Sequence, residues 1–234
     1  MATALDLEEQ EQLDQLKHFW RKWGNAITWV LIVVFGAVAA WNGYQYWQRR
    51  EAARAAILFD TVRQAAQAGD LAMVTRSFSD IRNDYGSTTY AQQAGFLAAK
   101  VFYDKGKPDE ARQALAWVAD KTSDEGYRAI ARLRLASLLM QAKSYDDARK
   151  QLDGSFPDAF APLVADRLGD IALLQGKKTE AVAEYLRAYH GLTADRPYRR
   201  IVEVKLASLG ADPQAQAAAA ASGAASAASA GGRS

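Results

Sequence analysis

The chain has 234 residues, of which 50% are hydrophobic and 24% are charged, and its formal net charge is +2. This length fits one compact domain with appendages. Because positive and negative charges nearly balance, the composition excludes a general nucleic-acid binder, which usually carries a strongly basic face. There is no cysteine, which excludes disulfide scaffolds, thiol catalysis and cysteine zinc sites.

The N-terminal part of the sequence divides into a short acidic segment, 1–22, and an uncharged segment, 23–48. The 26 residues between Lys22 and Arg49 carry no charge and have tryptophan or tyrosine near both ends. About 20 residues of helix cross the hydrocarbon core of a lipid bilayer, so we expect one transmembrane helix over 23–48. Lysine and arginine flank both of its ends, and the charge count therefore leaves the orientation open.

Residues 49–210 have the pattern of a helical repeat. Apolar residues recur at intervals of three and four, and the breaks between the periodic stretches are short. One recurring position is spaced by 37, 37 and 33 residues and is occupied by Val74, Ala111, Ala148 and Ala181. This pattern is typical of tetratricopeptide repeats. It predicts an all-α fold, in which a single N-terminal transmembrane helix is followed by a tetratricopeptide-like solenoid of helical hairpins.

The C-terminal part of the sequence predicts a capping helix and a tail. The stretch Pro197–Leu209 places Val202, Leu206 and Leu209 on one helical face. Such a face suits the capping helix that covers the last apolar surface of a solenoid. Residues 211–234 are mostly alanine, serine and glycine and lack bulky apolar side chains, so we expect a disordered tail there.

Small residues within the repeats predict close contacts between helices. The best match to the repeat pattern begins at Pro162 and contains Gly169 and Ala181. Because small residues let two helices approach closely, we expect Gly169 and Ala181 to face each other within this hairpin.

The sequence contains no pattern that indicates a catalytic centre. The two histidines, His18 and His190, lie on opposite sides of the uncharged segment, which argues against a multi-histidine metal site. No phosphate-binding glycine loop follows a strand, and no zinc-protease or calcium-loop motif is present. We therefore expect no enzymatic activity, no metal and no other cofactor.

A protein-binding surface is the stronger hypothesis. In tetratricopeptide proteins the first helix of each hairpin lines a concave face. The expected groove consists of first-helix residues: Phe59, Arg63, Phe96, Lys100, Tyr103, Leu133, Met140, Asp166, Asp170 and Leu173. Its apolar side chains, with a few charges of both signs, suit polypeptide segments of varied sequence. The alternative is that several of the apolar residues pack beneath neighbouring helices.

The order of an acidic N-terminus, one span and degenerate repeats resembles the YfgM family, the ancillary subunit of the bacterial SecYEG translocon. The most specific stretches are Thr122–Ala136 and Phe160–Ala181, and the resemblance covers residues 1–210. It implies a single-pass protein of the bacterial inner membrane, with a cytoplasmic N-terminus and a periplasmic repeat domain.

The resemblance also implies partners. These are the SecYEG translocon, periplasmic chaperones and client polypeptides, namely emerging secreted or outer-membrane proteins that are handed to the chaperones. The alternative is that the same repeats form a scaffold for another envelope machine, such as one for division or cell-wall synthesis. The residues alone leave these two functions open.

Overall fold

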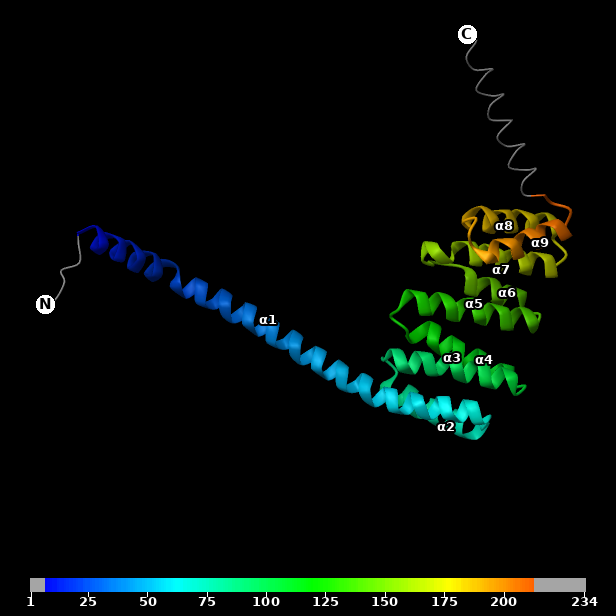
Figure 1. The fold of residues 1–234 in the computed structure, drawn as a ribbon, viewed down its shortest axis with the longest axis horizontal. Coiled ribbons are helices and arrows are strands. Elements are labelled where there is room, and N and C mark those ends of the chain that lie inside the picture. Colours follow the sequence, from blue (N-terminus) through cyan, green and yellow to red (C-terminus); the bar gives the residue numbers. More distant parts are fainter. Residues whose placement is uncertain (1–6, 213–234) are drawn as a thin grey trace, which may run out of the picture. The chain divides into compact units, whose positions relative to one another are not determined.

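The computed structural model describes residues 7–212, and side chains from residue 17 onward. Every regular element in this range is helical, which confirms the all-α fold class (Figure 1). The elements are α1 Leu7–Ala68, α2 Leu71–Tyr85, α3 Thr89–Asp104, α4 Pro108–Lys121, α5 Glu125–Gln141, α6 Tyr145–Leu152, the short 3₁₀ helix η1 Asp158–Phe160, α7 Ala161–Leu174, α8 Lys178–Gly191 and α9 Pro197–Ser208. Apart from its first two residues, the expected tail 211–234 lies outside the described residues.

The chain divides into two compact units between Arg54 and Ala55. The part of the first unit that the structure describes is a stretch of helix α1, which contains the expected transmembrane helix. Every side chain from Trp29 to Phe35 is exposed, with Val33 at 66% and Phe35 at 68%. Seven successive residues cover the whole circumference of a helix, and a helix that is apolar all round is typical of a membrane span. By length and composition, the helix from Lys17 onward can cross a membrane.

Helix α1 does not end with the uncharged segment. We expect a boundary between span and repeat domain at residue 49, but the helix continues without a break to Ala68. The linking stretch 51–56 consists of glutamate, arginine and alanine, which are strong helix formers. The first helix of the first repeat is therefore the last part of α1.

The second unit, from Ala55 onward, is a stack of helical hairpins. The end of α1 pairs with α2, α3 with α4, α5 with α6 and α7 with α8, and the hairpins follow one another in chain order (Figure 1). Three clusters of buried alanines and larger side chains form the core of the stack. Helix α9 covers the last hairpin with Val202 and Leu206, which are both fully buried. The expected solenoid with a capping helix is thus confirmed.

A left-handed residue closes the turn of each hairpin. The φ angles at this position are 67° at Gly69, 71° at Gly106, 60° at Lys143 and 77° at Gly176. In every case the next residue donates its N–H to a carbonyl five residues back, for example Lys107 to Phe102 at 2.8 Å. This hydrogen bond ends the first helix and turns the chain into the second. The four positions have the same spacing as the recurring positions found in the sequence.

Helices α7 and α8 approach each other closely at Gly169, but the residue that contacts Gly169 is not the expected Ala181. A Cβ atom added to Gly169 would lie 2.6 Å from the ring of Tyr185. Gly169 therefore makes room for an aromatic ring of the second helix, and that ring is its nearest neighbour in place of Ala181. Ala181 is fully buried in the same core cluster as Tyr185.

Lys143 is the one residue other than glycine with a positive φ among the described residues. An L-residue in the left-handed region costs roughly 1–2 kcal/mol, whereas glycine adopts it freely at a smaller entropic cost. We expect Lys143→Gly to raise the free energy of unfolding by about 0.5–1 kcal/mol, as measured by urea unfolding of the full chain in detergent. Lys107→Gly, directly before the second helix of the neighbouring hairpin (α4) and at a φ of −114°, is the control and should not stabilise. A Lys143→Gly variant that is less stable than the parent would contradict this account of the turn.

Candidate functional site

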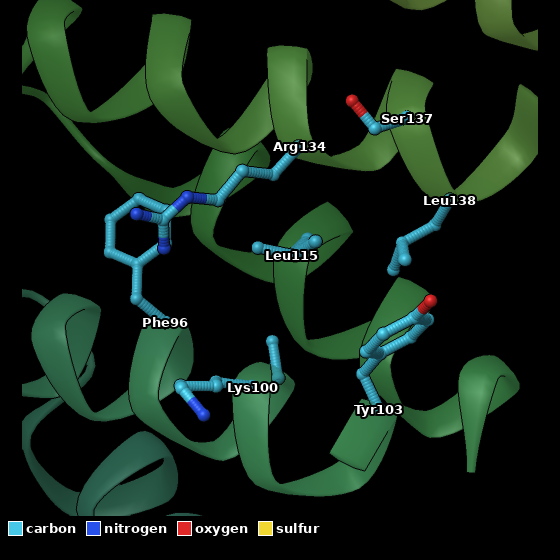
Figure 2. Close-up of a pocket in the computed structure, with 8 residues that line it drawn as sticks. Phe96, Lys100, Tyr103, Leu115, Arg134, Ser137 and Leu138 are labelled. Atoms are coloured by element: carbon cyan, nitrogen blue, oxygen red, sulfur yellow. The ribbon is translucent and has the colours of Figure 1, made fainter. Parts of the chain in front are cut away.

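A hollow of about 320 Å³ lies between α3 and α5, and we call it the α3–α5 hollow (Figure 2). On α3, its lining residues recur at intervals of three and four, which places them on one helix face. It is lined by Phe96, Ala99, Lys100 and Tyr103 from α3, Leu115 from α4, and Arg134, Ser137 and Leu138 from α5. Ala99 and Leu115 are buried, so the floor of the hollow is apolar.

Contacts between the two helices hold the aromatic walls of this hollow. Tyr103 donates its hydroxyl hydrogen to Oε1 of Gln141 at 2.8 Å, while 44% of the residue stays exposed. The Phe96 ring lies 5.8 Å from the ring of Tyr127, and the guanidinium carbon of Arg134 lies 5.0 Å from the Phe96 ring centre. Both rings are therefore fixed in place and still present a surface to a partner.

A second hollow, of about 390 Å³, lies between α5 and α7. We call it the α5–α7 hollow. It is lined by Ser137, Met140, Gln141, Lys143, Tyr145, Arg167 and Leu174. Because Ser137 lines both hollows, they meet at α5, and together they form what we call the α5 groove. Helix α5 thus contributes side chains to both halves of one surface.

The structure brings together only some of the expected groove residues. Phe96, Lys100 and Tyr103 line the α3–α5 hollow, and Met140 lines the α5–α7 hollow. The remaining apolar and basic positions line neither hollow. Phe59 packs on the first core cluster, Arg63 forms an exposed ion pair with Asp60 at 2.9 Å, Leu133 packs on the third core cluster, and Leu173 is 36% exposed.

Asp166 and Asp170 require a correction, because they are not groove residues. Asp166 is fully buried and accepts hydrogen bonds from Tyr198 at 2.6 Å and Lys205 at 2.7 Å. Asp170 accepts from Lys205 at 2.6 Å, from Tyr185 at 2.8 Å and from Arg167 at 2.8 Å. Tyr198 and Lys205 belong to α9, so both carboxylates are occupied in attaching the capping helix. We call these six side chains the cap cluster.

Burial also raises the pKa of the two tyrosines in the cap cluster, Tyr185 and Tyr198. Burial, and then the hydrogen bond to Asp170, raise the pKa of the Tyr185 hydroxyl above its ordinary value. Burial and the hydrogen bond to Asp166 raise the pKa of Tyr198 in the same way. Both hydroxyls therefore stay protonated at neutral pH and can donate to the carboxylates.

Sequence reasoning missed the groove residues Arg134, Leu138 and Gln141. The repeat pattern placed Leu133 and Met140 on the groove side of α5, but the lining side chains of this helix lie at 134, 137, 138, 140 and 141. The lining stripe thus lies about one position further along the helix. The intervals of three and four among these positions were the available signal. The repeat alignment hid this signal because it assigned Leu133 to the surface.

The contacts of the cap cluster predict that replacing Lys205, which pairs with both carboxylates, destabilises the fold. Lys205→Met removes the nearer cation of the buried Asp166 and leaves it only Arg167 at 4.0 Å. Breaking a buried pair by removing one partner costs about 3 kcal/mol or more. We expect a loss of this size in the free energy of unfolding, measured by urea unfolding of the full chain in detergent. Lys178→Met removes an exposed lysine from α8 and is the matched control. Equal stability of the two variants would rule out a structural role for the cluster.

Comparison with known proteins supports the repeat assignment and identifies the family. Residues 17–211 match the model of a tetratricopeptide repeat-like domain. The chain is 32% identical over 210 residues to an ancillary SecYEG translocon subunit of Neisseria gonorrhoeae, covering 88% of this chain and 99% of that protein. It is 28% identical to the subunit of the same name from Escherichia coli (74% and 83% covered) and 26% to that of Haemophilus influenzae (79% and 90%). The chain therefore belongs to the family of ancillary SecYEG translocon subunits.

Proposed function

We propose that this protein is a membrane-anchored protein-interaction module that is ancillary to the SecYEG translocon. The names of its relatives support the translocon as a partner. The apolar helix from Lys17 onward suits an anchor in the membrane that contains the translocon. The observation that carries the proposal is the α3–α5 hollow, where the exposed Tyr103 ring stands beside a buried apolar floor.

The chemistry of this hollow favours binding of a polypeptide over catalysis. Its floor of Ala99 and Leu115 is buried and apolar, while the rings of Phe96 and Tyr103 offer flat apolar walls. Aromatic side chains in such pockets supply a large part of the binding energy in protein complexes. A groove between stacked helices accepts an extended or helical segment whose side chains enter successive hollows.

The proposal extends to the location and the clients of the module. By likeness to its family, the N-terminus is cytoplasmic and the repeat domain is periplasmic. The α5 groove would then meet secreted or outer-membrane proteins as they emerge from the translocon. Weak, adaptable binding by Met140 and the aromatic walls suits transfer of such segments to periplasmic chaperones.

Membrane topology gives the first test of this proposal. Protease added to spheroplasts, in which the periplasmic face is open, should degrade 55–212 and leave a membrane-protected fragment that contains the span. An antibody against the repeat domain follows its loss, and an intact cytoplasmic marker protein confirms that the inner membrane is sealed. Full protection of the repeat domain until detergent is added would place it in the cytoplasm and overturn the periplasmic role.

The groove gives the second test. Tyr103→Ala removes the ring from the α3–α5 hollow, and truncation of a buried aromatic anchor costs about 2 kcal/mol, or roughly thirtyfold in affinity. We expect a loss of this order in crosslinking to translocon subunits and clients, measured with a photoreactive amino acid at position 137 in intact membranes.

A second tyrosine of the same helix provides the matched control. Tyr90 is 36% exposed and does not line the α5 groove, so Tyr90→Ala should crosslink like the parent. Circular dichroism of both variants in detergent verifies that the helices are retained. If folded Tyr103→Ala protein crosslinks as well as the parent, the partner-binding surface lies elsewhere.

A further inference from the structure

The charged side chains that line the α5 groove are all of one sign. Four basic residues line its two hollows: Lys100 and Arg134 in the first, Lys143 and Arg167 in the second. No aspartate or glutamate is among the lining residues of either hollow. This bias is local, because the formal net charge of the whole chain is only +2. The groove is therefore a basic surface on a nearly neutral protein.

Two of these cations have carboxylate partners, and two do not. Lys100 pairs with Asp104 one turn along α3, and Arg167 pairs with Asp170 of the cap cluster. Within residues 17–212, neither Arg134 nor Lys143 forms an ion pair. These two positive charges remain available to a carboxylate from outside the chain.

Arg134 is the better placed of the two to act together with the apolar hollow. Its guanidinium lies beside the Phe96 ring, at 5.0 Å from carbon to ring centre, on the edge of the hollow opposite Lys100 (Figure 2). Stacking on the ring orients the planar guanidinium and leaves its N–H edges free for a carboxylate. A ligand side chain in the hollow would thus have a fixed cation beside it.

We propose that the α5 groove selects acidic segments of its protein partners. An apolar side chain of the segment enters the α3–α5 hollow between Phe96 and Tyr103, and a neighbouring carboxylate pairs with Arg134. Lys143, at the turn between α5 and α6, attracts further negative charge along the second hollow. This inference rests on the proposed function and adds the chemistry of the segment that is bound.

Charge complementarity favours an acidic amphipathic peptide over a purely apolar one. A hydrophobic segment without charge would gain contacts with the floor and walls of the hollow but would leave Arg134 unpaired. A basic segment would bring like charges together, which disfavours binding. Because Arg134 is exposed, its pairing adds modest affinity and mainly adds selectivity.

Three matched peptides test the proposal on the full chain in non-ionic detergent. They share one length, one fluorescent label and the same leucine and phenylalanine positions, and their polar positions are all glutamate, all glutamine or all lysine. Fluorescence anisotropy should show the glutamate peptide binding about fivefold more tightly than the glutamine peptide at low salt. The lysine peptide should bind most weakly. The difference should shrink as salt rises to about 0.5 M, because exposed charges are screened.

Single substitutions test whether the preference for acidic peptides comes from the α5 groove. Arg134→Gln should bring the glutamate peptide close to the affinity of the glutamine peptide and leave the latter unchanged, whereas Tyr103→Ala should weaken both. Arg200→Gln removes an exposed arginine that lines neither hollow, and it should leave all three affinities unchanged.

Three outcomes would overturn the proposal. The first is equal binding of the three peptides or no binding of the glutamate peptide, and the second is a preference that persists in Arg134→Gln. The third is a self-association of the chain that the glutamate peptide reverses, because a second copy would then be the occupant of the groove. If crosslinks from position 137 still reach the translocon, only the acidic preference fails, and the proposed function stands.

Discussion

The repeat domain is organised by one backbone conformation that recurs at the turn of each hairpin. At Gly69, Gly106, Lys143 and Gly176 the chain enters the left-handed region, and the hydrogen bond from the next residue ends the first helix. This closure directs each second helix back along the first. The core clusters and both hollows form between hairpins that close in this same way. The α5–α7 hollow even includes the turn residue Lys143 among its lining residues.

Burial of charge determines which part of the surface of the repeat domain remains available for binding. At the C-terminal end, α9 brings Lys205 and Tyr198 onto Asp166 and Asp170, and their polar atoms satisfy one another. A carboxylate as deeply buried as Asp166 is tolerated only with such partners. The last hairpin is thereby closed, and the open surface lies over α3, α5 and the adjoining side of α7. Arg167 belongs to the cap cluster and also lines the α5–α7 hollow, so it links the closed end of the domain to the groove.

The apolar circumference of α1 and the proposed partner-binding groove lie in different parts of the chain. The exposed apolar circumference of α1 from Trp29 to Phe35 suits lipid, whereas the α5 groove combines a small apolar floor with positive charge. These two surfaces satisfy different requirements. Lipid contact needs apolar side chains in every direction, while recognition of a peptide needs a few side chains held by neighbouring helices.

The sequence by itself determined the helical class, the span, the repeat spacing and the capping helix, because each of these follows from local periodicity, composition or turn residues. It also identified Phe96, Lys100 and Tyr103, which share one face of α3. Only the tertiary structure decided the roles of Asp166 and Asp170, since their α9 partners Tyr198 and Lys205 lie about thirty or more residues away in the sequence. It likewise decided that Arg134 and Leu138, and not Leu133, face the groove. The rotation of α5 depends on how its neighbours pack against it, and no local pattern contains that information.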